Sequence, residues 1–405
     1  MRISDIRGAV QLATHATTGV TRIVEEVHQS VWDRLGVPGG KTPGKTRGVT
    51  GAVYRLVHDI TRVTGKSANT VISLLESVFE ADGNKLSRTP RGETFLSILN
   101  GVMGDRLVEE NNPFAIPMAF RYRELAPGQQ VPLIEPGSSG KVLLLLHGLC
   151  LSDLQQNARN SNHLAEPGAL LATALGYRPV YLRYNSGLHI SRNGHELAVR
   201  LEDLLNNWPE PVEELSVVAH SMGGLVMRSA LHQAQQQGLL WPRQLKNIVF
   251  LGTPHHGAPL ERAGNWLDII LEKIPHTRPF SALGKLRSAG ITDLRYGNLL
   301  DQDWHGQDRF DLQPDRRQAV PLPVAVNCFT VAATMAEKRG ILSDRLVGDG
   351  LVPLRSALGQ HDEPSRNLDF SESSQWIAWR TGHMGLLNSP AVNDQILQWL
   401  SPETA

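Results

Sequence analysis

Short apolar runs alternate with amphipathic stretches from about residue 114 onward, and this alternation constrains the fold more than any other feature of the sequence. The runs have the length of strands and are apolar at consecutive positions, which is typical of strands buried on both faces. The intervening stretches, such as 194–205 and 225–236, carry apolar residues at helical spacing. The sequence therefore predicts a doubly wound, mostly parallel α/β sheet with helices on both faces. The predicted buried strands are residues 141–146, 179–184, 215–219, 246–251 and 324–333.

Weaker strand signals frame this region. Residues 119–124 and 129–133 flank the turn dipeptide Pro127-Gly128 and predict a hairpin ahead of the buried strands. Residues 375–379 predict a last strand, and the amphipathic stretch 392–400 predicts a terminal helix. Sheets of this kind bind ligands beyond the carboxyl ends of their strands, so we expect the chemistry in the turns that follow the strands.

The first 112 residues have a different pattern. Apolar residues recur there at spacings of three and four, which predicts amphipathic helices that pack as a small bundle. We therefore expect an N-terminal helical domain over 1–112 and an α/β domain over 113–405. Residues 39–46 read GGKTPGKT and match the phosphate-loop pattern, but they follow the end of a predicted helix and contain Pro43. A phosphate loop needs a buried strand before it and a helix opening on its Lys-Thr, so we interpret these residues as a linker.

The composition limits the class of protein. Hydrophobic residues make up 41% of the 405 residues and charged residues 20%, which is ordinary for a folded soluble chain. The formal net charge is zero, without the basic excess of a nucleic-acid binder. The two cysteines, Cys150 and Cys328, cannot form a disulfide framework. Residues 1–20 make a poor signal peptide and no apolar run reaches membrane-spanning length, so we expect a cytoplasmic protein.

The strongest signal for chemistry is the segment Ala219-His220-Ser221-Met222-Gly223-Gly224, which joins a predicted strand to a predicted helix. A serine on such a sharp turn projects its hydroxyl above the sheet, and small neighbours let the turn close. The segment matches G-x-S-x-G with Ala219 in place of the first glycine. Alternatively, Ser221 only caps the helix, but a cap would not need two glycines in the first helical turn. We therefore predict Ser221 as a nucleophile and the Met222 N–H as one oxyanion donor.

Five short segments follow one another along the α/β region. They are His147-Gly148-Leu149, the turn at 219–224, Gly252-Thr253-Pro254-His255-His256-Gly257, Gly348-Asp349-Gly350-Leu351-Val352-Pro353 and Gly382-His383-Met384. In this order they resemble bacterial lipases and esterases of the α/β-hydrolase superfamily. The resemblance covers residues 115–402 and does not extend to 1–112. It implies the α/β-hydrolase fold, an acid at Asp349, a catalytic histidine at His383 and a second oxyanion N–H at Leu149.

The residues themselves point to the same roles. Acyl transfer by serine needs a base to take the hydroxyl proton and an acid to orient that base, in the chain order serine, acid, histidine for this fold. Only His361 and His383 follow the candidate acids. His383 lies between the last predicted strand and the terminal helix, whereas His361 lies in a polar, proline-containing stretch, so we favour His383. For the acid we favour Asp349, which two glycines flank, while Asp344 and Asp362 stay open as alternatives.

The other histidines are interpreted as structural. His147 belongs to the predicted oxyanion loop, and the adjacent His255 and His256 cannot both face one site, so we expect hydrogen-bonded supports and no metal role. A metal hydrolase would need a pair such as H-E-x-x-H on one helix face, which does not occur in the sequence. No metal and no cofactor are therefore expected.

A long insertion between two predicted strands bears on the substrate. Residues 258–320 contain an apolar stretch at 266–274, which predicts either a buried cap helix or a lid over an apolar cleft. Both readings place apolar surface near the serine and favour a lipophilic acyl ester.

The sequence thus favours a serine carboxylic-ester hydrolase, an esterase or lipase that acts through an acyl-enzyme. One alternative is an acyltransferase that uses the same Ser221, Asp349 and His383. Another is a lipid- or partner-binding scaffold without turnover. The N-terminal helices are expected to dock on the α/β domain, with peripheral contact to a membrane or lipid surface, or to a partner protein, as alternatives.

Overall fold

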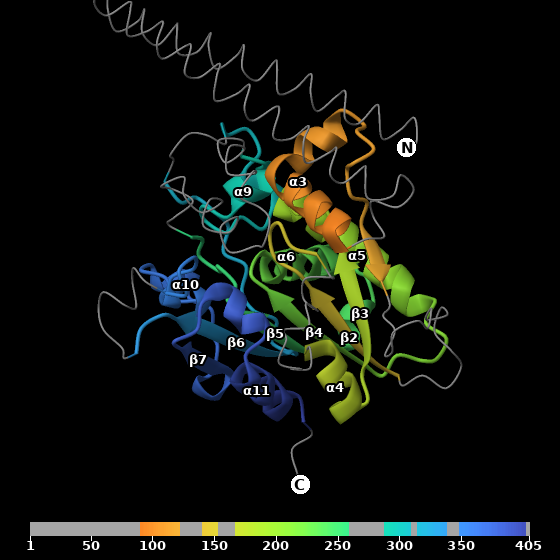
Figure 1. Ribbon diagram of the computed structural model, residues 1–405, viewed down its shortest axis with the longest axis vertical. Coiled ribbons are helices and arrows are strands. Elements are labelled where there is room, and N and C mark those ends of the chain that lie inside the picture. The colour runs from red at the N-terminus through yellow and green to blue at the C-terminus, as the bar shows by residue number, and fades with distance from the viewer. Residues whose placement is uncertain are drawn as a thin grey trace, which may run out of the picture.

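A seven-stranded sheet forms the centre of the molecule (Figure 1). The computed structural model describes residues 90–121, 140–152, 167–258, 287–308, 314–337 and 348–401. The strands are β1 (Ala119–Arg121), β2 (Lys141–Leu146), β3 (Arg178–Arg183), β4 (Glu214–His220), β5 (Leu245–Leu251), β6 (Asn327–Thr334) and β7 (Gln375–Trp379). Their order is β1-β3-β2-β4-β5-β6-β7, with β1 antiparallel to β3 and all other neighbours parallel.

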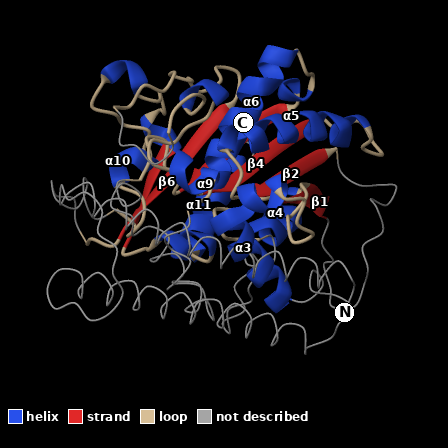
Figure 2. Ribbon diagram, turned by 90° about the horizontal axis from the view of Figure 1, so that it is seen from above, coloured by secondary structure: helices blue, strands red, loops and turns tan. Residues whose placement is uncertain are grey.

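Helices lie on both faces of this sheet (Figure 2). The α-helices are α3 (Pro90–Glu109), α4 (Pro167–Leu175), α5 (Ile190–Asn206), α6 (Met222–Gln237), α9 (Ala289–Asp293), α10 (Leu354–Ala357) and α11 (Pro390–Leu400). Short 3₁₀ turns are η3 (Trp241–Arg243), η5 (Asp301–Asp303), η7 (Pro364–Arg366), η8 (Glu372–Ser374) and η9 (His383–Leu387). A mostly parallel sheet covered on both faces, with this strand order, fits an α/β-hydrolase fold.

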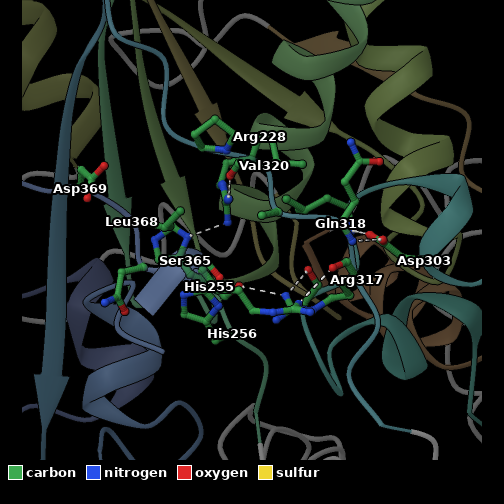
Figure 3. Close-up of a pocket in the computed structure, with 16 residues that line it drawn as sticks. Arg228, His255, His256, Asp303, Arg317, Gln318, Val320, Ser365, Leu368 and Asp369 are labelled. Atoms are coloured by element: carbon green, nitrogen blue, oxygen red, sulfur yellow. Dashed lines mark hydrogen bonds between the residues drawn. The ribbon is translucent and has the colours of Figure 1, made fainter. Parts of the chain in front are cut away.

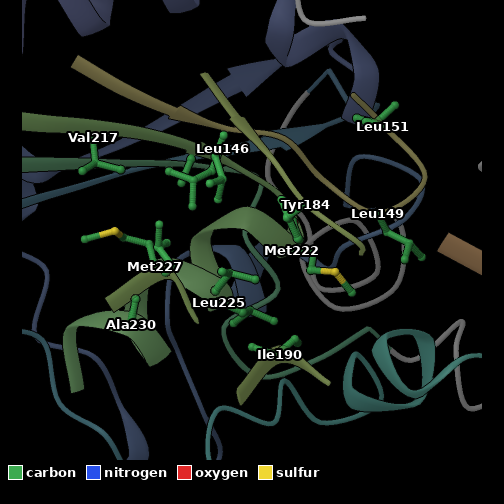
Figure 4. Close-up of a cluster of buried hydrophobic side chains, with 14 of the residues drawn as sticks. Leu146, Leu149, Leu151, Tyr184, Ile190, Val217, Met222, Leu225, Met227 and Ala230 are labelled. Carbon is green, nitrogen blue, oxygen red and sulfur yellow. The ribbon is translucent and has the colours of Figure 1, made fainter. Parts of the chain in front are cut away.

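Strand β2 shows how the sequence produces the two layers. Successive side chains of a strand point to opposite faces, so a strand that is apolar at every position must be covered twice. Leu144 and Leu146 pack in one hydrophobic cluster with α5 and α6, and Figure 4 shows Leu146 beside residues of α6 such as Leu225. Leu143 and Leu145 pack in the other cluster, with residues of α4 and α11.

The strand order also fixes where a ligand site belongs. The chain passes from β2 to its neighbour β3 and then crosses to β4 on the other side of β2. This reversal is a topological switch point, and such sheets bind ligands in the crevice beyond the carboxyl ends of the strands there. The loop at 147–151 follows β2 and the turn at Ser221 follows β4, so both predicted elements of the site meet this crevice.

Helix α3 packs into the same core as the sheet. Its apolar residues, including Leu99 and Val102, belong to the cluster that contains β2 and α6. The carboxylate of Glu93, which is fully buried, accepts hydrogen bonds from Nε and Nη2 of Arg183 at 3.1 and 3.0 Å. The domain boundary predicted at residue 112 therefore does not coincide with a break in the packing, since α3 lies on the N-terminal side of it.

Helix α3 also contacts the inserted segment. Ser288 Oγ donates to the carbonyl oxygen of Gly101 at 2.6 Å, and the Ala289 N–H donates to Asp105 Oδ2 at 3.0 Å. These bonds join α3 to the start of α9. The segment at the start of α9 in the predicted insertion is thus buried structure docked on α3; the apolar stretch at 266–274 lies outside the described residues.

Most predicted strands agree with the structure to within two residues, and β2 and β7 agree at both ends. The strand predicted at 324–333 begins later, at Asn327, and Val324 is fully exposed in the preceding turn. The first half of the predicted hairpin is β1, which pairs with β3; its second half, most of the N-terminal bundle and the GGKTPGKT segment lie outside the described residues. Among the described helices, none combines the length and apolar character that a membrane span requires.

Candidate active site

Ser221 occupies a strained turn between β4 and α6. Strand β4 ends at His220 and α6 begins at Met222, which leaves Ser221 alone at the corner with φ 55° and ψ −125°. A positive φ at a residue other than glycine costs about 1–3 kcal/mol and persists where the surrounding structure enforces it. Its N–H donates to the carbonyl oxygen of Leu251 at 2.8 Å, which fixes the turn against β5. The serine side chain makes no helix-capping hydrogen bond, so Ser221 does not act as an ordinary cap.

Small residues around the turn allow this close packing. A Cβ on Gly223 would lie 2.7 Å from the carbonyl oxygen of His147, and one on Gly148 would lie 3.0 Å from Cβ of Ser221. Ala219, which replaces the first glycine of the motif, is fully buried at a regular strand position opposite Leu146 and Phe250. The extra methyl group of alanine is therefore accommodated in the sheet.

Asp349 and His383 form a buried hydrogen-bonded pair. His383 Nδ1 lies 2.7 Å from Asp349 Oδ2, and both residues are at most 2% exposed. The other carboxylate oxygen, Oδ1, accepts the N–H groups of Leu351 and Val352 at 2.9 and 2.8 Å. The His383 N–H donates to the Asp349 carbonyl oxygen at 3.1 Å, so main chain and side chain both hold the pair. A carboxylate at Nδ1 places the proton there and leaves Nε2 as the acceptor.

The structure separates the rival residues from this pair. His361 Nε2 lies 3.8 Å from Asp315 Oδ2, and the His361 ring lies 5.0 Å from that of His256. Asp362 is exposed and accepts a hydrogen bond from Arg355 at 2.6 Å. Asp344 lies outside the described residues. Of the two histidines considered, His383 is the one that meets Asp349.

The serine turn and the Asp349–His383 pair meet at the carboxyl ends of β4 and β5. Gly252 has φ 58°, and a Cβ there would lie 3.2 Å from His383 Nδ1 and 3.3 Å from Asp349 Oδ2. Its neighbour Leu251 accepts the Ser221 N–H. Between the described side chains of Ser221 and His383 there is no hydrogen bond. Catalytic hydrogen bonds are often long in unliganded enzymes and shorten in the reacting complex.

His220 connects the two halves of the site, and the sequence analysis missed it. Its Nε2 lies 3.3 Å from the carbonyl oxygen of His383, and the two rings are 4.7 Å apart. Burial, and then the nearby His383, lower the pKa of His220 well below its usual value, so the ring is neutral. A neutral ring that faces a carbonyl oxygen carries its proton on Nε2 and donates it. The position next to the predicted nucleophile was the signal available in the sequence.

The loop after β2 runs directly over the serine. Tyr184 Oη donates to the carbonyl oxygen of His147 at 2.8 Å and its ring stacks on the His147 ring at 4.3 Å. Cys150 has φ 60°, and its N–H donates to Ser186 Oγ at 3.2 Å. Leu149 and Met222 are both buried. The Met222 N–H belongs to the first turn of α6, where helix geometry supplies no acceptor.

The adjacent His255 and His256 belong to the loop that follows β5. His256 Nε2 donates to the carbonyl oxygen of Gly359 at 3.0 Å, and the His256 N–H donates to Ser356 Oγ at 3.1 Å. Burial of the ring lowers the pKa of His256 to about 3, and burial also lowers that of His255. In the described part of the chain, no three His, Cys, Asp or Glu side chains are grouped as metal ligands would be.

Comparisons with known proteins add a limited context. A protein-family profile described as "Domain of unknown function (DUF7379)" matches residues 116–283, which is less than half of the chain. No curated protein sequence matches the chain.

Solved structures give weak similarities. Lipase BlEst2 of Bacillus licheniformis, in its mature form, is 20% identical with a TM-score of 0.41, over 70% of this chain and 97% of the lipase. Esterase Pf2001 of Pyrococcus furiosus is 15% identical with a TM-score of 0.36, over 65% of this chain and 81% of the esterase. Phospholipase PlaB of Legionella pneumophila is 13% identical with a TM-score of 0.36, over 54% of this chain and 46% of the phospholipase chain. The fold assignment rests on the strand order and the Ser221 turn, because TM-scores of this size do not support it.

Proposed function

We propose that the chain is a serine carboxylic-ester hydrolase that acts through an acyl-enzyme. Ser221 is the nucleophile, His383 the base and Asp349 the acid that orients the base. One observation carries the proposal: a serine with a positive φ, on a strand-to-helix turn, is linked through its neighbour His220 to a buried carboxylate–imidazole pair. A strained backbone and a buried ionisable pair are both costly, and their coincidence in one crevice is typical of a catalytic site.

The first chemical step follows from the tautomer of His383. Asp349 holds the ring proton on Nδ1, so Nε2 accepts the proton of the Ser221 hydroxyl as Oγ attacks the ester carbonyl carbon. The imidazolium that results is stabilised by the carboxylate 2.7 Å away. His383 then donates the proton to the leaving alcohol oxygen, which gives the acyl-enzyme and a free alcohol.

The second step repeats the first with water. His383 Nε2 removes a proton from a water molecule, whose oxygen attacks the acyl carbon. The bond from that carbon to Ser221 Oγ breaks, and the proton passes from His383 back to Oγ. In both steps negative charge develops on the former carbonyl oxygen, and the N–H groups of Leu149 and Met222 are proposed to receive it. Loss of one such donor typically costs about 10²–10³ in kcat.

The surroundings of the serine favour a lipophilic acyl group. Leu149, Leu151, Met222 and Leu386 are all buried, and Leu386 Cδ1 would lie 2.7 Å from a Cβ on Gly252, beside the Asp349–His383 pair. Apolar walls bind an acyl chain through the area that it removes from water, about 25 cal/mol per Å². A charged acyl group would lose its hydration there without a partner.

A chain-length series tests this function. The full chain is assayed with p-nitrophenyl esters of increasing acyl length, beside the Ser221→Ala variant. We expect hydrolysis by the wild type, kcat/KM that rises with acyl length over the first members, and no turnover by Ser221→Ala above the uncatalysed rate. Equal rates for the two proteins would contradict the proposal. The same assay with added glycerol distinguishes an acyltransferase, which would yield acylglycerol instead of the free acid.

A further inference from the structure

A cavity lies behind the loop that carries His255 and His256. It has a volume of about 270 Å³ and is lined by α6, by that loop, and by residues 317–321 and 365–369 (Figure 3). Arg228 reaches it from α6, seven residues after Ser221. At 1.5 Å per residue, this is about 10 Å along the helix, so the cavity is separate from the serine.

Arg228 is a buried cation without a counter-charge. The residue is 7% exposed. Its Nη2 donates to the carbonyl oxygen of Val320 at 2.5 Å, and Nη1 lies 3.4 Å from His255 Nδ1. Nε has no hydrogen-bond partner, and no carboxylate pairs with the guanidinium in the described part of the chain. Burial and the nearby Arg317 lower the pKa of Arg228 to about 9.

The other arginines of the cavity are already neutralised. Arg317 pairs with both oxygens of Asp315 at 3.0 and 2.9 Å. Arg366 donates to Glu363 at 2.7 Å and to Asp315 at 3.4 Å. Their charges are therefore largely balanced by neighbours, and Arg228 is the uncompensated guanidinium.

The acidic residues of the lining do not supply that balance. Asp303 accepts backbone N–H groups on both carboxylate oxygens, from Leu299 and Leu300 at 2.8 and 2.9 Å and from Gln318 at 3.1 Å. Asp369 is exposed at the rim. Neither of them contacts Arg228.

His255 lies against Arg228 but offers no accessible donor to the cavity. Its ring is fully buried and neutral, because burial and Arg228 hold its pKa well below the usual value. Nδ1 faces the Arg228 guanidinium and must accept, so the ring proton is on Nε2. Nε2 has no partner. A buried N–H group left unsatisfied costs about 1–3 kcal/mol, and a buried unpaired charge costs more.

We propose that this cavity binds a small organic carboxylate, with Arg228 as the recognition group. A carboxylate has planar acceptor oxygens that suit the guanidinium, and its charge compensates Arg228. Val320, Pro321 and Leu368 line the cavity and offer apolar contact to a short carbon chain. The inference is independent of the ester hydrolase, because it uses none of that site's reacting groups.

Binding is tested on the full chain with butyrate, by calorimetry and by thermal unfolding, at constant ionic strength with chloride as the balancing anion. Inorganic phosphate is the comparison anion. We expect saturable butyrate binding that raises the melting temperature and exceeds phosphate binding at equal concentration. Arg228→Gln should weaken butyrate binding by at least about tenfold, because a charge-assisted hydrogen bond is lost. The matched control is Arg200→Gln, at an exposed arginine paired with Glu196, which should bind like wild type.

Three results would overturn the proposal: no saturable butyrate binding by wild type, equal binding by Arg228→Gln, or preference for phosphate. If Arg228→Gln does not fold, Arg228→Lys is used instead. It keeps the positive charge but lacks the planar guanidinium with its paired N–H donors, so it should bind butyrate more weakly than wild type. Soaking a wild-type crystal in meta-bromobenzoate tests the site without any substitution. The bromine anomalous signal should lie in the cavity beside Arg228, and a cavity without it would refute the assignment.

Discussion

The Nδ1 atom of His383 lies 2.7 Å from Oδ2 of Asp349, although the two residues are 34 positions apart in the chain. The remaining carboxylate oxygen is saturated by the N–H groups of Leu351 and Val352. Asp349 can therefore orient the imidazole in one way only. The two backbone bonds fix the carboxylate, and the carboxylate fixes the tautomer of the ring.

This arrangement predicts the effect of Asp349→Asn. The amide oxygen will accept from Leu351 and Val352, which turns the NH₂ group towards His383 Nδ1 and moves the ring proton to Nε2. The histidine then cannot accept the serine proton, and kcat should fall by about 10⁴ with the fold retained. Asp344→Asn is the control and should be nearly silent on the same soluble ester. If Asp344→Asn is inactive and Asp349→Asn is active, the acid that orients His383 is Asp344 and the assignment to Asp349 is wrong.

The variants His383→Ala and His361→Ala should differ sharply in hydrolytic activity. His383→Ala removes the base and should be as inactive as Ser221→Ala, because a serine hydroxyl is a weak nucleophile near neutral pH without one. His361→Ala disturbs contacts with Asp315 and His256 and should keep most of the activity. Initial rates on one p-nitrophenyl ester decide between them. The reverse result would mean that the proposed base is wrong.

His220 is expected to position His383 without touching substrate. His220→Phe removes the donor to the His383 carbonyl oxygen and should lower kcat by about tenfold with little change in KM. His220→Gln keeps an N–H donor and should restore part of the loss. A purely structural role would instead lower the amount of folded protein in both variants and leave kcat per folded molecule unchanged. Kinetics normalised to active-site titration measure the difference.

Acid should destabilise the fold partly through His256. Its pKa is about 3 when folded and 6.5 as a free side chain, so the unfolded chain binds the proton more readily. The stability that the neutral ring contributes is complete above pH 6.5 and is lost progressively as the pH falls towards 3. His256→Gln keeps a donor for Gly359 but cannot titrate. In urea unfolding at a series of pH values, the free energy of unfolding of His256→Gln should rise less steeply with pH than that of wild type, by up to about 1.4 kcal/mol per pH unit. Identical slopes would contradict the assignment.

Much of the fold could be predicted because consecutive apolar residues admit few alternatives. The run at 141–146 must be covered on both faces, and it becomes β2 in the middle of the sheet. The strand at 324–333 was extended too far because Val324 is apolar, yet it lies exposed in a turn. Helix α3 was placed in a separate bundle, since amphipathic spacing identifies an apolar face but not the surface that it meets. Gly101 and Gly104, which contact Cys150 and Asn185 closely, were the signal of that docking.

The site was predictable as far as chain order reaches. The order of serine, acid and histidine left His361 and His383, and the position between the last predicted strand and the terminal helix favoured His383. The two flanking glycines favoured Asp349. The sequence did not show which residues far apart in the chain contact one another in the fold. His220 and Gly252 join the two halves of the site, and Arg228 contacts His255, because β4, β5 and the segments after them end side by side.

The account depends most on Ser221 as a nucleophile. Intact wild-type protein and the Ser221→Ala variant are each treated with a fluorophosphonate, and the labelled peptide is located by mass spectrometry. The account predicts stoichiometric labelling of wild type on the peptide that contains Ser221, with none on Ser221→Ala, whose circular dichroism should match wild type. Labelling of both proteins alike, or of neither, would contradict it.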